Sequence, residues 1–442
     1  DESTGKVRQY TSLTEDGDKK RMIESREESK NVMRSQCGTG EIYKTSLVEK
    51  LINLAAVKYA TLDPAGAGIE MEAGKPGWYD ALNGLPGLFG SSVAEAFELS
   101  RLFRFLEDML KEFPSETLKI PEEVMRLIGE LVEATEDYEA SRDDRRDFRF
   151  WERISEIREK YREETKLGFG GREVSIGSSE MSRALEGFNA KLRKTLDKET
   201  AKNDGIMPTY FFYETEKFEI IKRAEDESAK HVKVDQFRQK KMPLFLEGIV
   251  RGFKTHDDRH FLKEVYSRVR ESELYDKKLK MYKVNAPLGG ESIEIGRARA
   301  FTPGWLENES IWLHMEYKYL LEMLRSGLYE EFYEDFKNVL VPFMKPAVYG
   351  RSTLENSSFI ASSANQDESI HGTGFVARLS GSTAEFLSIW KLMLAGERPF
   401  EYENDRLILR LRPLLPGWLF DKDGKVSFNF LGRCLVTYFN PE

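Results

Sequence analysis

Apolar residues recur three or four positions apart through much of the chain, which is the spacing of an amphipathic helix. Ser46 and Pro121 stand where two of these runs begin, and both residue types favour helix initiation. The pattern predicts helices at 46–61, 92–113, 121–141, 144–166, 181–200, 258–273, 310–326 and 328–341. Residues 1–45 are polar with runs of charge, and we expect a connecting helical segment there.

After about residue 398 the spacing changes. The runs LILRLRPLLPGWLF and KVSFNFLGRCLVTYF alternate apolar and polar residues, with Pro-Gly and Asp-Gly between them, which predicts strands and hairpins. A short β-like run also occurs at 205–214. The sequence therefore predicts a mainly α protein with a helical catalytic domain at 46–398 and a C-terminal β segment at 399–442. Long helices joined in pairs by glycine-rich loops favour an α/α toroid, although periodicity alone does not define that topology.

Composition narrows the class of protein. The 442 residues carry a formal net charge of −9, which argues against nonspecific nucleic-acid binding and against an anionic membrane surface. No apolar run is long enough for a membrane span. The two cysteines, Cys37 and Cys434, are too far apart in the sequence to suggest a disulfide framework or a zinc signature. A reducing, cytoplasmic compartment is the expected location.

A first candidate site lies in the glycine- and proline-rich stretch 62–92. Asp80 follows Trp78 and Tyr79 there, and Asn83 comes shortly after. A long loop inside a helical protein is usually functional. Sugar sites combine an aromatic platform with a carboxylate whose pKa is raised by burial against a ring. The alternative is that Asp80 caps a turn and Trp78 packs in the core.

A second candidate site lies in TPGWLENESIWLH, residues 302–314. Glu307 and His314 are seven positions apart, so a helix that had already begun at Glu307 would place both side chains on one face. The alternative is an ordinary helix start, where Glu307 and Glu309 are favourable N-terminal residues and His314 is a satisfied histidine.

A third candidate site lies between Tyr349 and Glu385. It ends in Ser-Gly-Ser-Thr before a helical run, and such a turn presents backbone N–H groups and hydroxyls to an anion. Arg351 and His371 could add positive charge. An ordinary Ser/Thr N-cap is the alternative. No Walker A motif and no nucleophile elbow occur in the sequence.

Together the three segments resemble the glycoside phosphorylases related to cellobiose phosphorylase. The likeness is to the long members that act on β-glucan oligosaccharides with 1,2 or 1,3 linkages, and it covers about residues 46–442. GKPGWYDALNGLPGLFGSS is similar to the family's general-acid loop, and TPGWLENESIWLH to its Pro-Gly-x-x-Glu-Asn segment. GFVARLSGSTAEF is similar to the turn that holds phosphate. Tyr79 stands where the family usually has Asn, and Ser380 where it has Thr.

The resemblance implies an (α/α)6-barrel-type toroid, incomplete here, and inverting phosphorolysis of β-linked glucan oligosaccharides that releases α-glucose 1-phosphate. Asp80 would be the general acid. The implied sugar contacts are Trp78, Tyr79, Asn83, Trp305, Glu307 and Glu355. The implied phosphate contacts are His314, Arg351, His371, Ser380, Gly381 and Ser382. No metal and no organic cofactor is expected, because inorganic phosphate is the co-substrate.

Two other functions stay open. The first is an inverting β-glucan hydrolase on the same barrel with Glu307 or Glu355 as base, and the second is a non-catalytic glucan-binding subunit. The family members are longer and begin with a β-sandwich domain, so we expect this chain to be the C-terminal part of a larger enzyme. Its expected partners are a β-glucan oligosaccharide, phosphate, and an N-terminal companion chain or a second copy of itself, with no nucleic acid and no membrane.

Overall fold

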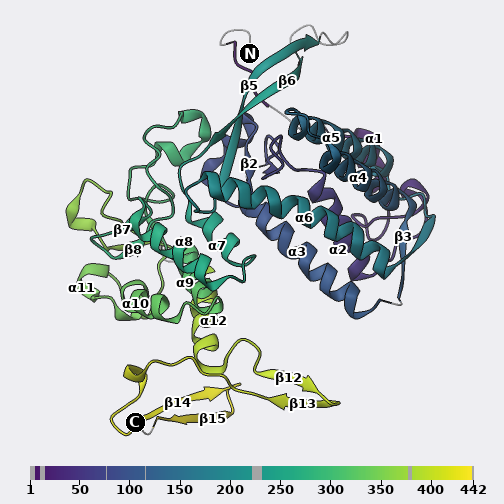
Figure 1. Ribbon diagram of the computed structural model, residues 1–442. Coiled ribbons are helices and arrows are strands. Elements are labelled where there is room, and N and C mark those ends of the chain that lie inside the picture. The colour runs from purple at the N-terminus through teal and green to yellow at the C-terminus, as the bar shows by residue number, and fades with distance from the viewer. Residues whose placement is uncertain are drawn as a thin grey trace. The chain divides into compact units, whose positions relative to one another are not determined.

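A computed structural model gives the structure of the chain and describes residues 5–9, 15–75, 77–114, 116–221, 231–376 and 381–440. The fold is mainly α-helical with small antiparallel sheets (Figure 1). The chain divides into two compact units. The first comprises Asp1–Asp257, Glu264–Leu274 and Asn285–Thr302, and the second comprises Asp258–Lys263, Tyr275–Val284 and Pro303–Glu442.

The first unit contains most of the long helices. Its helices are α1 (Gly17–Glu24), α2 (Leu47–Tyr59), α3 (Val93–Glu112), α4 (Glu122–Ala140), α5 (Arg146–Thr165), α6 (Ser178–Lys202) and α7 (Leu246–Phe253), and α8 (Arg259–Glu271) is shared with the second unit. Side chains cap two of the predicted starts. Ser46 accepts from the backbone of Glu49 in a capping box before α2, and Ser92 accepts from Glu95 before α3. The helices predicted at 46–61, 92–113, 121–141, 144–166, 181–200 and 258–273 are confirmed as α2, α3, α4, α5, α6 and α8.

The core of the helical part of the first unit centres on Tyr59 of α2. Its ring is fully buried and stacks on Phe188 of α6 with centroids 4.5 Å apart. Phe103 of α3 and Phe150 of α5 meet the same ring edge-on. The Tyr59 hydroxyl lies 3.0 Å from Thr135 Oγ1 of α4, so the one polar atom of this residue is also satisfied. Five helices therefore share one aromatic core.

A long hairpin extends the sheet of the first unit. β1 (Ile69–Glu70), β2 (Ser91–Ser92), β5 (Tyr210–Ile221) and β6 (His231–Lys241) pair in that order, and β5–β6 projects from the helices (Figure 1). β3 (Thr117–Pro121) and β4 (Glu173–Gly177) form a separate pair. The β-like run at 205–214 is confirmed only in its second half, since β5 begins at Tyr210 and continues well beyond 214.

The second unit is built from shorter elements. Its helices are α9 (Leu313–Arg325), α10 (Tyr329–Val339), α11 (Pro346–Tyr349) and α12 (Gly381–Ala395). The short strands are β7 (Tyr275–Asp276), β8 (Met281–Tyr282), β9 (Ile311–Trp312), β10 (Phe359–Ile360) and β11 (Gly374–Phe375). β10 lies between β9 and β11 in a three-stranded sheet.

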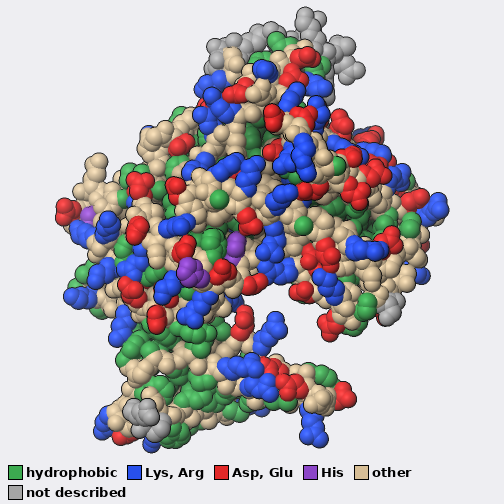
Figure 2. Space-filling model, viewed as in Figure 1, with side chains coloured by type: hydrophobic (Ala, Val, Ile, Leu, Met, Phe, Trp, Pro, Cys, Tyr) green, Lys and Arg blue, Asp and Glu red, His purple; other side chains and the backbone are tan. Residues whose placement is uncertain are grey.

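The predicted C-terminal strands are present as two hairpins. β12 (Phe400–Glu403) pairs with β13 (Arg406–Leu409), and β14 (Lys425–Phe430) pairs with β15 (Cys434–Phe439). Apolar side chains gather on the surface of these hairpins (Figure 2), with Tyr402, Leu407 and Leu435 about 70% exposed. The hairpins belong to the second unit, and the division between units falls inside the range 46–398, which the sequence treats as one domain. The closed α/α toroid stays a prediction.

Candidate functional site

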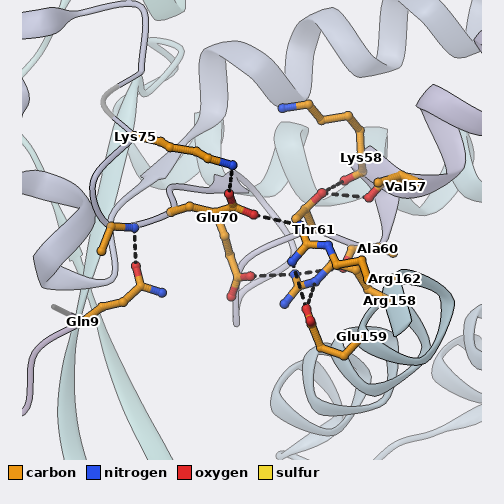
Figure 3. A network of polar contacts seen from close by, with 12 residues as sticks. Gln9, Val57, Lys58, Ala60, Thr61, Glu70, Lys75, Arg158, Glu159 and Arg162 are labelled. Carbon is orange, nitrogen blue, oxygen red and sulfur yellow. Dashed lines mark hydrogen bonds and ion pairs between the residues drawn. The ribbon is translucent and has the colours of Figure 1, made fainter. Parts of the chain in front are cut away.

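The Asp80 loop, defined here as residues 73–87, is framed by β1 and β2. These two strands pair Glu70 with Ser91, and so bring the two ends of the glycine-rich stretch together. Glu70 also accepts from Arg158 Nη1 of α5 at 2.9 Å (Figure 3). It accepts from Trp151 Nε1, on the same helix, at 2.6 Å. Burial raises the pKa of Glu70, against the opposing effect of Arg158. The base of the loop is therefore attached to α5 through the partly buried carboxylate of Glu70.

Tyr79 and Asp80 are neighbours with opposite exposures. Tyr79 is 2% exposed, donates to Asn285 Oδ1 at 3.4 Å and packs edge-on against Phe245. Asp80 begins a 3₁₀ turn, η2 (Asp80–Leu82), and is exposed beside the half-exposed Trp78. The sugar contact expected of Tyr79 does not follow from this arrangement, because its ring faces the core. Tyr79 instead anchors the loop that presents Asp80.

The far side of the loop rests on a segment much later in the chain. Gly84 lies so close to η4 (Ile293–Ile295) that a Cβ on it would be 2.0 Å from the carbonyl oxygen of Glu294. The predicted sugar ligand Asn83 is exposed, and its Oδ1 accepts from the backbone N–H of Arg297 at 3.1 Å. Glycine at position 84 thus allows a close backbone approach that holds the loop.

The second candidate cluster is built on the β9–β10–β11 sheet. Trp312 of β9, Phe359 of β10 and Phe375 of β11 lie against one another, and Trp305 stacks on Phe375 at 3.7 Å with an interplanar angle of 5°. β9 and β11 are both antiparallel to β10, so they run in the same direction. β9 leads directly into α9, which begins at Leu313.

His314 meets the first residue of α12. An ideal Cβ on Gly381 would lie 2.1 Å from both Cε1 and Nε2 of His314, so only glycine fits there without displacing the ring. His314 itself is the second residue of α9, and Ser382 is buried next to Gly381. The amino ends of two helices therefore converge on one imidazole. Helix amino ends carry partial positive charge and unpaired N–H groups, which suit an anion.

The turn before α9 corrects one interpretation of the sequence. Glu307 and His314 do not share a helix face, because Glu307 precedes the helix and β9 separates the two. Leu306 and Glu309 adopt positive φ angles of 50° and 56°, which non-glycine residues rarely do. Such backbone strain gathers at functional sites. Glu307 is half-buried in this strained turn.

The remaining predicted phosphate ligands, Arg351, His371 and Ser380, have different surroundings. Arg351 Nη2 lies 3.5 Å from Glu355 Oε1, and the buried Arg351 Nε has no hydrogen-bond partner among the described residues. His371 already contacts Lys278 Nζ through Nδ1 and the carbonyl of Asn365 through Nε2, each at 2.8 Å. Ser380 lies outside the described residues. The roles assigned to these residues stay predictions.

Two charged neighbours of this cluster were missed from the sequence. Glu385 Oε1 lies 3.7 Å from His314 Nε2, close enough for an ion pair when the imidazole is protonated. Lys283 Nζ lies 2.8 Å from Glu309 Oε2 in a pair that is about one-tenth exposed. Glu385 follows Gly381 by one helical turn, so the sequence alone could have placed both residues on one face of α12. No sequence pattern indicates Lys283, because its contact with Glu309 joins two separate segments.

No protein-family model and no curated protein matches this chain. Among the described residues, no helix is both long and apolar enough to cross a membrane. Within those same ranges, no group of three or more His, Cys, Asp or Glu side chains is arranged to hold a metal ion.

Proposed function

We propose that the protein catalyses inverting phosphorolysis of β-linked glucan oligosaccharides, with Asp80 as general acid and inorganic phosphate as nucleophile. The observation that carries the proposal is the close approach of His314 to Gly381 at the start of α12. A phosphorylase needs a place for an anion, whereas an inverting hydrolase needs a second carboxylate to activate water. The start of α12 beside the imidazole of α9 supports the proposal of an anion site there.

In the proposed reaction, Asp80 assists the bond that breaks and phosphate forms the new bond. Asp80 protonates the glycosidic oxygen as its bond to C1 breaks. A phosphate oxygen attacks C1 from the opposite face and forms the new C–O bond, so the products are α-glucose 1-phosphate and a glucan shortened by one unit. His314, the N–H groups at Gly381 and the Ser382 hydroxyl are the proposed phosphate donors. The exposure of Asp80 is consistent with a group that must reach substrate.

Other residues are proposed to bind around these groups. Trp78, Asn83, Trp305, Glu307 and Glu355 contact sugar in this proposal. Arg351, with its buried Nε aimed at no described partner, contributes to phosphate binding together with Ser380. His371 is also proposed to bind phosphate, and to do so it would give up its contact with either Lys278 or the Asn365 carbonyl. A barrel-type catalytic domain and a cytoplasmic location are part of the same proposal.

A phosphate-dependence assay tests the proposal. The protein is incubated with β-1,3- and β-1,2-linked gluco-oligosaccharides with and without phosphate, and α-glucose 1-phosphate is measured. The same measurement runs in reverse with α-glucose 1-phosphate and oligosaccharide acceptors, following released phosphate. Phosphate-dependent turnover in both directions supports the proposal.

Two results would contradict it. Release of free glucose at a rate independent of phosphate would indicate a hydrolase, and Glu307→Gln and Glu355→Gln would then identify its base. Oligosaccharide binding without turnover in either direction would indicate a glucan-binding subunit.

A further inference from the structure

The N-terminal residues 6–9 lie against the Asp80 loop at both of its ends. The Gln9 side chain accepts from the backbone N–H of Ala73 at 3.0 Å, at the start of the loop (Figure 3). The Gln9 backbone N–H donates to the carbonyl of Gly87 at 2.9 Å, at the end of the loop. One residue therefore bridges two points that enclose Asp80.

The same segment also contacts the support beneath the loop. Arg8 donates to Glu294 from Nε at 3.2 Å and from Nη2 at 2.9 Å, a two-point contact that fixes orientation as well as distance. Lys6 Nζ adds a third contact to Glu294 at 3.1 Å. Glu294 belongs to η4, whose Ile295 carbonyl accepts from the N–H of Gly84 in the middle of the loop.

These contacts add to others that already join the same parts of the first unit: the β1–β2 pairing holds the two ends of the stretch, and Gly84 and Asn83 contact the segment around η4. η4 lies far along the sequence from the loop, and both belong to the first unit. Inside the loop, the backbone bonds are few and local, such as Leu82 N–H to Tyr79 and Gly87 N–H to Gly84. A loop with so few internal bonds opens easily unless its ends are held.

We propose that residues 6–9 form a clasp that positions the Asp80 loop for catalysis, with Arg8 and Gln9 as positioning residues. This inference rests on the proposed function, because it assigns the clasp a role in presenting the general acid. The clasp reacts with nothing and contacts no substrate. It restricts the loop to the arrangement in which Tyr79 points inward and Asp80 outward.

Hydrogen exchange tests the clasp without relying on activity. The double variant Arg8→Ala/Gln9→Ala is compared with wild type, following the amides of Leu82, Gly84 and Gly87. The variant loses the Gln9 side-chain bond to Ala73 and the two-point ion pair of Arg8, whereas the backbone bond from Gln9 to Gly87 remains. Exchange of the three amides should therefore speed up by roughly tenfold. The value of kcat should fall by a similar factor while KM for phosphate stays within about twofold, since phosphate contacts are unaltered.

Two further variants separate positioning from general stability. Arg8→Lys keeps the charge but loses the two-point geometry, so both effects should be intermediate. Arg21→Ala removes an exposed ion pair with Asp18 on α1 and should leave exchange and kcat as in wild type. The unfolding midpoint of the double variant should lie no more than about 4 °C below that of this control, because the lost contacts contribute about 1 kcal/mol.

Unchanged exchange of the three loop amides would overturn the proposal, and so would faster exchange with unchanged kcat. A fall in kcat that merely follows a lower unfolding midpoint would also count against it. If wild type shows no phosphorolysis, the proposed function fails and the positioning role fails with it. The exchange result would then still establish whether the segment holds the loop.

Discussion

The Asp80 loop and the His314–Gly381 pair support their reactive groups in contrasting ways. The loop is held by many separate contacts: a buried Tyr79 ring, a close backbone approach at Gly84, and hydrogen bonds at its ends. The His314–Gly381 pair depends on one steric fit between an imidazole and a helix that begins without a side chain. The loop should therefore tolerate the loss of a single hydrogen bond, although not the loss of the Tyr79 ring, whereas the pair should not tolerate the gain of a single methyl group.

The largest effect is expected from Asp80→Asn. This change removes the proposed proton donor without touching the buried neighbours, so kcat should fall by about 10²–10⁴-fold. The unfolding midpoint should stay at the wild-type value, because Asp80 is exposed. Steady-state kinetics and a thermal melt measure the two quantities. Asp108→Asn, an exposed carboxylate on α3, is the matched control and should retain full activity.

Tyr79→Ala tests the support of the same loop. Removing a fully buried aromatic ring should lower the free energy of unfolding by about 3–5 kcal/mol. Tyr402→Ala removes a ring that is 71% exposed and should change it by less than about 0.5 kcal/mol. Urea unfolding of both variants measures the difference. Equal, small effects would show that Tyr79 does not anchor the loop.

Gly381→Ala tests the steric fit. The added methyl must displace the His314 ring, and overpacking of this kind costs about 1–3 kcal/mol. If displacing the ring weakens phosphate binding by this free energy, KM for phosphate should rise by about 5- to 150-fold. Gly129→Ala in α4 is the control, since its Cβ meets no atom and should stabilise the helix by about 1 kcal/mol. An unchanged KM for phosphate would remove the His314–Gly381 pair from the proposed site.

The smallest effect concerns acid pH. Arg8 and Lys6 hold the pKa of Glu294 at about 2, below its ordinary value of 4.5. The folded state therefore binds fewer protons than the unfolded chain, and the stabilisation present above pH 4.5 is lost as pH falls toward 2. Because Glu294 is more than one-third exposed, the effect is limited to about 0.2–1 kcal/mol.

Glu294→Gln provides the measurement for this prediction. Its difference in unfolding free energy from wild type should be present at pH 7 and should shrink steadily below pH 4.5. A difference that is constant with pH would show that the ion pairs contribute nothing to stability.

Local signals explain which parts of the fold were predictable. The starts of α2 and α3 depend on Ser46 and Ser92 and the residues within one turn of them, so short-range sequence patterns suffice. The opposite exposures of Tyr79 and Asp80 depend on Asn285 and Phe245, which lie far along the chain. No periodicity reports such contacts.

The candidate site shows the same limit. Leu306 and Glu309 adopt left-handed backbone that their side chains disfavour, and α9 begins only at Leu313. The shared helix face of Glu307 and His314 required a helix that had begun by Glu307, and it is therefore absent. The two-residue strands β9, β10 and β11 are too short to leave an alternating pattern. Motif resemblance pointed to His314 and Gly381 separately, whereas their contact required the fold.

The fit at Gly381 also provides a way to recognise related chains. Any chain that shares this arrangement must combine a histidine at the second position of one helix with a glycine at the first position of its neighbour. A serine or alanine in place of that glycine would be incompatible with the same imidazole position. Searches for distant relatives can therefore require both residues jointly, a condition that sequence similarity to either segment alone does not impose.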